Sequence, residues 1–113
     1  MNDCIFCKII ANEIPSTRVF ENDRILAFKD IQPMAPVHIL IIPKEHICGV
    51  NGLTEENAGV VSEIMLVAKQ LAEEFHLDNG YRIVTNVGDD GGQTVKHLHY
   101  HLLGGEKLNT TLC

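Results

Sequence analysis

The sequence predicts a single α+β domain over residues 1–113, built on a five-stranded antiparallel sheet with one short and one long helix. Three observations predict this class. Segments with the apolar pattern of strands flank one long segment with helical periodicity. Apolar residues make up 45% of the chain and charged residues 21%, as a packed core requires. No internal repeat, low-complexity tract or linker divides the sequence.

Five segments have the composition of strands, and turn residues separate them. Asn, Asp and Gly between these segments indicate turns and loops, and Pro43 closes the third segment. We expect the first three to form one antiparallel sheet that the last two complete. The expected strands are residues 18–20, 24–30, 38–42, 81–87 and 96–103.

Two further segments have helical periodicity. Residues 4–11 place apolar side chains on one face of a helix that is too short to be stable alone. A long helix is expected from Thr54, the predicted N-cap, to the stop signal at residues 78–80, Asp-Asn-Gly. Val60 and Val67 widen its apolar stripe beyond one face. This width fits either contact with a partner subunit or a helix that is fully covered within a monomer.

Charge and hydropathy exclude several classes of function. Nine Lys and Arg against 15 Asp and Glu give a formal net charge of −6, so the chain lacks the basic surface that nucleic acid polymers require. No apolar run approaches the ~18 residues of a membrane span, and the N-terminal residues do not resemble a secretory signal. We therefore expect a cytoplasmic protein with neither a membrane nor a nucleic acid polymer as partner. A small nucleotide remains an admissible ligand.

The histidines of the last predicted strand are the strongest functional signal. His97, His99 and His101 alternate, so a strand places their three imidazoles on one face. Such a face suits ligation of a catalytic metal, or direct attack by one neutral imidazole while its neighbours position the transferred group. The Gly-rich loop at residues 88–94 favours the second chemistry, because backbone N–H groups in such loops bind anions. An ordinary hairpin loop is the alternative interpretation of that segment.

These residues resemble a known signature. Residues 92–103, GQTVKHLHYHLL, are similar to the His-φ-His-φ-His-φ-φ motif of the histidine triad (HIT) family, with its upstream Gly-Gln-Ser/Thr-Val. Segments 8–15, 27–31 and 35–44 also stand in family order, so the resemblance covers nearly the whole chain. Residues 103–105, Leu-Gly-Gly, resemble the Hint branch, which cleaves nucleoside phosphoramidates. The fragile-histidine-triad branch, which cleaves dinucleoside polyphosphates, usually has Pro-Arg there.

The resemblance implies a nucleotidyl hydrolase or transferase that cleaves purine nucleoside 5′-phosphoramidates without a catalytic metal. The alternatives are a dinucleoside polyphosphate hydrolase and a nucleotide-binding or scaffold protein with little turnover. By this resemblance His99 is the nucleophile that takes the nucleoside monophosphate, and His101 contacts the phosphate and assists the leaving group. His97 completes the triad, and His38 matches a fourth histidine of the site. Asp30 matches the carboxylate that binds the ribose hydroxyls.

The other nucleotide contacts implied by the resemblance fall into two groups. The phosphate contacts are Asn86, Gly92, Gln93, Thr94 and Val95. The apolar walls of the base pocket are Ile5, Phe6, Ile9, Phe28 and Ile31. Plain core packing explains the apolar set equally well at this point.

A Cys-x-x-Cys pair, Cys4 and Cys7, indicates metal or redox chemistry in a reducing compartment. Taken alone, it fits equally well two reduced cysteines on an apolar helix face. Zinc-bearing HIT proteins complete a Cys2His2 site at the positions of His46 and His97, so the resemblance implies a structural zinc on these four residues. Zinc on His97 would leave the chemistry to the other two triad histidines. Its loss is expected to cost stability more than it changes the chemical step.

A homodimer is the last expectation. Hint-like proteins pair through the helix that corresponds to the long helix predicted here, together with an adjoining strand. Such pairing would bury the second apolar face that the wide stripe of this helix suggests.

Overall fold

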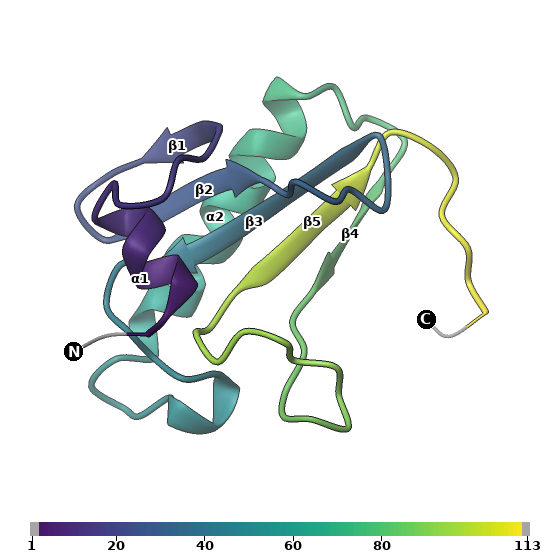
Figure 1. Cartoon of the computed structure of the whole chain (residues 1–113). Helices are drawn as coiled ribbons and strands as arrows, with labels where there is room; N and C mark the ends of the chain where they lie inside the picture. Colours follow the sequence, from purple (N-terminus) through teal and green to yellow (C-terminus); the bar gives the residue numbers. More distant parts are fainter. Residues whose placement is uncertain (1–2, 112–113) are drawn as a thin grey trace.

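The computed structural model describes residues 3–111 and confirms the predicted fold class. Five strands form one antiparallel sheet in the order β1-β2-β3-β5-β4. Helix α1 lies on one face of this sheet and helix α2 on the other (Figure 1). The helices are α1 (Ile5–Ile10) and α2 (Gly59–Glu74), with a short 3-10 turn η1 (Val50–Gly52) between them in sequence. The strands are β1 (Arg18–Glu21), β2 (Ile25–Lys29), β3 (Val37–Pro43), β4 (Tyr81–Val84) and β5 (Tyr100–Gly104).

Alternation along β2 and β3 explains why both faces of the sheet are covered. Successive side chains of a strand point to opposite faces, and here both sets are apolar. The α2 face buries Ile25, Ala27, Ile39 and Ile41, and the α1 face buries Leu26, Phe28, Leu40 and Ile42. Helix α1 adds two buried residues, Phe6 and Ile9, to this layer and does not fill it, since a cavity lies beside the sheet.

Helix α2 is shorter than predicted at both ends. Thr54 does not cap it, because Thr54 and Asn57 bond each other in a separate turn. The Thr54 N–H donates to Asn57 Oδ1 at 2.7 Å, and the Asn57 N–H donates to Thr54 Oγ1 at 3.2 Å. At the other end His76 has a φ of 59°, a left-handed conformation that cannot continue a right-handed helix. The predicted stop signal at residues 78–80 therefore lies beyond the helix.

The apolar stripe of α2 also differs in detail from the prediction. Val60 and Val67, whose extra width fitted either a partner contact or a helix covered within the monomer, are buried in the core against the sheet. Met65 and Leu66 carry the exposed apolar surface instead, and Leu66 is 67% exposed. Within residues 3–111, no helix is long and apolar enough to span a bilayer.

Strand β5 begins at Tyr100, so His97 and His99 precede it instead of lying within it as predicted. The cause is a hydrogen bond outside the sheet. The Leu98 N–H donates at 2.6 Å to the carbonyl of Ile47, which lies in the loop after β3, and not to a residue of β3. Side chains in this segment nevertheless alternate, because Leu98 enters the α2-side core while the imidazoles lie on the α1 side. The predicted common face of the three histidines is confirmed.

Strand β4 ends at Val84 and does not reach residue 87 as predicted. Val84 is the last residue that pairs with β5. Beyond it, the Thr85 hydroxyl donates to the carbonyl of His99 at 2.8 Å. A side-chain bond thus continues the contact between the two segments after the ladder has stopped.

Candidate active site

A cavity of about 290 Å³ lies on the α1 face of the sheet. Ten of the predicted nucleotide-site residues line it: Ile5, Phe6, Ile9, Phe28, Asp30, Ile31, Thr94, Val95, His99 and His101. Three of the five apolar residues, Phe6, Ile9 and Phe28, are buried and serve as core and wall at once. Ile31 is 92% exposed, so it contributes to the cavity wall and not to the core.

The Gln93 side chain does not line the cavity but holds the loop before β5 together. Its Oε1 accepts the Gly88 N–H at 3.0 Å, and its Nε2 donates to the carbonyls of Cys48 at 2.7 Å and Val95 at 3.1 Å. The Gln93 N–H also donates to the Gly88 carbonyl, at 3.0 Å. Both ends of the side-chain amide are therefore engaged within the protein.

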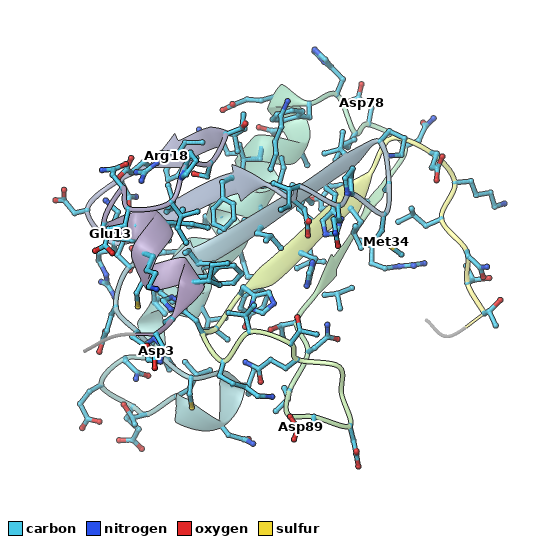
Figure 2. All side chains as sticks on the ribbon, in the orientation of Figure 1. Asp3, Glu13, Arg18, Met34, Asp78 and Asp89 are labelled. Atoms are coloured by element: carbon cyan, nitrogen blue, oxygen red, sulfur yellow. The ribbon has the colours of Figure 1, made fainter. Side chains whose placement is uncertain are left out.

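Asn86 and Gly92 also lie outside the cavity lining. Gly92 has a φ of 82° and its N–H donates to the carbonyl of Asp89, so Gly92 forms part of the turn in this loop. Figure 2 shows Asp89 at the outer end of the loop, away from the sheet. Of the five predicted phosphate contacts, Thr94 and Val95 are the two that the fold places at the cavity.

Sequence reasoning missed part of the lining. The additional residues are Ile14, Pro15, Ser16, Gln32 and Leu40. Leu40 could have been found, since alternation along its strand places it on the same face as Ile42. The segment after α1 has no periodicity that would reveal its orientation. Within it, the Ser16 hydroxyl oxygen is buried and has no hydrogen-bond partner among residues 3–111.

His99 is held with one ring nitrogen protonated and the other available. Its Nδ1–H donates to the carbonyl of His97 at 2.7 Å, which leaves the lone pair on Nε2. The ring is buried, with the rings of Phe6 and His101 each 5.1 Å away between centroids. An imidazole fixed in this way directs its Nε2 lone pair away from the backbone bond, which is the arrangement that nucleophilic catalysis by histidine requires.

His101 is held by a chain of hydrogen bonds that ends at the backbone. The Met34 N–H donates to His38 Nδ1 at 3.0 Å, so the proton of the neutral His38 ring is on Nε2. That Nε2–H donates to His101 Nδ1 at 2.8 Å, and the remaining proton of His101 is therefore on its own Nε2. The chain gives His101 the tautomer of a hydrogen-bond donor and general acid.

The surroundings of His38 and His101 keep both imidazole rings neutral. Burial lowers the pKa of His101 to about 4, and the neighbouring His99 and His38 rings add to the effect. Burial also lowers the pKa of His38, against the opposing influence of Asp30. Asp30 Oδ2 lies 3.4 Å from His38 Nε2, while its Oδ1 accepts the Gln32 N–H at 2.8 Å. The carboxylate keeps acceptor capacity for a ligand at the cavity.

A second cluster, Cys4, Cys7, His46 and His97, brings four donor atoms within 4.8 Å of one another. His97 Nδ1 lies 3.3 Å from Cys4 Sγ and 3.6 Å from Cys7 Sγ, and His46 Nδ1 lies 3.4 Å from Cys7 Sγ. Tetrahedral zinc with ordinary bond lengths separates sulfur and nitrogen ligands by about 3.6 Å. These three sulfur–nitrogen distances are close to that value, so the chemistry and spacing of the four residues fit a zinc ion.

The surroundings of His97 reinforce this fit. Its Nε2–H donates to the carbonyl of Pro43 at 2.8 Å, which leaves Nδ1 unprotonated and facing the two sulfurs. Zinc-ligating histidines commonly hold the other ring nitrogen in this way. Burial also lowers the pKa of His97 to about 4, which keeps the ring in the neutral form that a ligand requires.

The second group with metal-ligand composition, Asp30, His38 and His101, is less suited to a metal. A metal on His38 Nε2 would require the ring proton on Nδ1, where the Met34 N–H already donates. The geometry instead fits the hydrogen-bond chain described above.

This chain is similar to a known protein family and to solved structures. The HIT domain profile matches residues 11–108. The chain belongs to the HIT domain family. The solved structure of a HIT family hydrolase from Clostridium thermocellum is 49% identical, with a TM-score of 0.96, and the match covers 100% of this chain and 99% of that one.

Two curated relatives share this HIT domain. A 14 kDa zinc-binding protein of Brassica juncea is 47% identical over 109 residues, which cover 95% of this chain and 96% of the relative. The adenylylsulfatase HINT1 of Arabidopsis thaliana is 47% identical over 107 residues, which cover 93% of this chain and 73% of the relative. The likeness to proteins of these names agrees with the membership in the HIT family and its Hint-like branch.

Proposed function

We propose that this HIT protein is a nucleotidyl hydrolase that cleaves purine nucleoside 5′-phosphoramidates through a covalent intermediate on His99. The similarity to a HIT family hydrolase and to an adenylylsulfatase supports hydrolysis at a nucleoside 5′-phosphate. One observation carries the proposal. The hydrogen bond from His99 Nδ1 to the His97 carbonyl leaves Nε2 as a nucleophile at a cavity of the size of small-ligand sites.

The proposed reaction has two displacements at phosphorus. His99 Nε2 attacks the phosphorus, the bond to the leaving amine breaks, and His101 Nε2–H donates its proton to the departing nitrogen. Water then attacks the nucleotidyl-histidine, His101 accepts a proton from that water, and the bond between phosphorus and His99 breaks. The nucleoside monophosphate leaves with both rings restored. The His38 Nε2–H stays bonded to His101 Nδ1 at 2.8 Å throughout, so Nε2 of His101 is the atom that gives up the proton and takes it back.

The rest of the cavity supplies binding. Asp30 would accept hydrogen bonds from the ribose hydroxyls with the lone pairs that its Gln32 contact leaves unused. Phe6, Phe28 and Ile31 would enclose the purine between apolar surfaces. Among the residues predicted to contact phosphate, Thr94 and Val95 remain the candidates at the cavity.

A covalent trap tests the nucleophile. We expect mass spectrometry of a rapidly quenched reaction with an adenosine 5′-phosphoramidate to show a nucleotidyl adduct on His99. His99→Ala should abolish the adduct and turnover while AMP still binds. An adduct on another residue, or its absence during burst kinetics, would contradict the assignment. AMP binding without turnover of any substrate by the unaltered protein would favour the nucleotide-binding alternative.

The leaving group is tested by comparing substrates. The relative from Arabidopsis carries the name of an adenylylsulfatase, so adenylyl sulfate belongs in the comparison beside an AMP-amine and a dinucleoside polyphosphate. We expect the highest kcat/KM for the AMP-amine, because its nitrogen needs the proton that His101 offers. Faster cleavage of the dinucleoside polyphosphate would contradict the proposed class.

We further propose that Cys4, Cys7, His46 and His97 hold a structural zinc ion, which would tie α1 to the body of the protein. The distances in the cluster and the name of the Brassica relative support this. Elemental analysis should find about one zinc per chain, and Cys4→Ser should lower it. Zinc-free protein with an unchanged Tm would contradict the site. Two thiolate ligands also suit a reducing compartment, so we place the protein in the cytoplasm.

Finally, we propose that the protein is a homodimer. Strand β4 has only one neighbour in the described sheet, and Met65 and Leu66 form an exposed apolar surface on α2. Pairing of two copies through these elements would cover both features. Sedimentation equilibrium at micromolar concentration should give twice the chain mass of 12.6 kDa, and a single species of chain mass would contradict the dimer.

A further inference from the structure

His97 belongs to the metal cluster and to the catalytic site at the same time. Its ring faces the sulfurs of Cys4 and Cys7, and its Nε2–H is bonded to the Pro43 carbonyl. Its own carbonyl is the acceptor that holds His99 Nδ1–H, at 2.7 Å. A metal on the ring would therefore fix the residue whose backbone orients the nucleophile. One residue separates the two histidines, so little chain is available to absorb a displacement.

Helix α1 provides a second connection. Cys4 and Cys7 bracket its first turn, and the Cys7 N–H donates to Cys4 Sγ at 3.3 Å. Between them, Phe6 packs edge-on against both His97 and His99, with ring centroids 5.8 Å and 5.1 Å apart. A helix of six residues is not stable alone, so its position depends on its attachments. Its inner residues form one wall of the nucleotide cavity.

We infer that the Cys4, Cys7, His46 and His97 cluster positions the catalytic site, so that metal occupancy controls nucleotide affinity and the orientation of His99. This inference rests on the proposed function and extends it to regulation of the same site. It also differs from the expectation that metal loss affects stability more than chemistry. Groups that orient the ligands of a metal commonly change metal affinity or activity by 10–100-fold. For a comparable indirect effect on the position of the site, we expect AMP affinity to fall about tenfold without metal.

The first test measures AMP binding against metal occupancy. Calorimetry compares the zinc-loaded protein, the protein after a chelator, and the same sample reconstituted with Zn²⁺ or Co²⁺. We expect the Kd for AMP to rise about tenfold on metal removal and to return on reconstitution. Circular dichroism confirms that each sample is folded. Loss of the fold on metal removal would overturn the inference, because the metal would then support the whole domain and not this site.

The second test observes the nucleophile directly. Nitrogen NMR of the imidazoles should show protonated Nδ1 and unprotonated Nε2 for His99 in the loaded protein. We expect a mixture of tautomers without metal, since the His97 ring is then held by its Pro43 bond alone and its carbonyl is less firmly placed. An unchanged His99 spectrum and an unchanged AMP Kd, with only a lower Tm, would overturn the inference. The cluster would then stabilise the fold without positioning the catalytic site.

Matched variants separate the metal from other effects of the chelator. His46 is an exposed ligand that does not line the nucleotide cavity, so His46→Gln should weaken metal binding and make the AMP Kd depend on added zinc. His76→Asn changes an exposed histidine outside the cluster, in a left-handed conformation that Asn tolerates, and should behave like the unaltered protein. Equal zinc dependence in both variants would count against the inference. Neither readout requires turnover, so failure of the His99 adduct would refute the proposed function alone.

Discussion

Replacing Gln93 with leucine tests whether this side chain holds the loop or contacts the nucleotide. Gln93 is 6% exposed, and its amide makes three hydrogen bonds, to Gly88, Cys48 and Val95. Leucine would leave one N–H and two carbonyls without these partners, at about 0.5–1.5 kcal/mol for each bond. We expect the free energy of unfolding to fall by about 2–4 kcal/mol. For a domain of this size, that lowers the Tm by about 8–16 °C.

The assay is urea denaturation of the nucleotide-free protein, so that ligand binding cannot contribute. Gln70→Leu is the matched control, because Gln70 is exposed on α2 and makes a single surface bond to Glu74. That control should change the free energy of unfolding by less than about 0.5 kcal/mol. An equally small effect of Gln93→Leu, combined with weaker AMP binding, would refute the loop role and restore Gln93 as a nucleotide contact.

Four further predictions follow from single features. Because the pKa of folded His101 is about 4, the unfolded chain binds more protons between about pH 6.5 and 4, so stability should be lost as pH falls through this window. Denaturation at several pH values should show a flatter profile for His101→Gln. Arg18→Lys should cost about 1–2 kcal/mol of unfolding free energy, because lysine cannot reproduce the fork that bonds the end of α1 and β1 together; an unchanged urea midpoint would contradict this. Leu66→Glu should dissociate the proposed dimer in sedimentation while changing stability by less than about 0.5 kcal/mol, as expected at an exposed position. Ser16→Ala should raise the Tm of the nucleotide-free protein, since it removes a buried hydroxyl without a partner at a cost of about 1–3 kcal/mol. A fall in Tm would show that the hydroxyl is satisfied.

The face of each side chain was more predictable than the ends of the strands. Alternation placed His97, His99 and His101 on one side of the sheet, although only His101 lies within β5. Alternation needs only an extended backbone, whereas a strand also needs a paired neighbour. Because the Leu98 N–H bonds the Ile47 carbonyl, this segment does not pair with a neighbouring strand. No local pattern in the sequence predicts that hydrogen bond.

The sequence predicted the site well where motif residues line the cavity. It predicted the site less well where their side chains form hydrogen bonds to the protein's own backbone. Thr94 and His99 reach the cavity as the motif suggested. Gln93, from the same motif, turns inward to bind three backbone groups that are set by tertiary contacts. The tautomers of His38 and His101 likewise depend on the Met34 N–H, which belongs to a loop without regular structure.

The position of β5 has a consequence for folding. This strand is the last of those in residues 3–111, yet it lies between β3 and β4, so Val37 and Ile41 can pair only after Gly104 and Tyr100 have been synthesised. Until residues 100–104 have emerged from the ribosome, β3 presents an open edge that can capture another chain. The late closure of such a distant contact is also expected to slow refolding. His99, which precedes β5 directly, therefore enters its site only after residues 100–104 have been synthesised, and no nascent chain that ends before them carries the assembled triad.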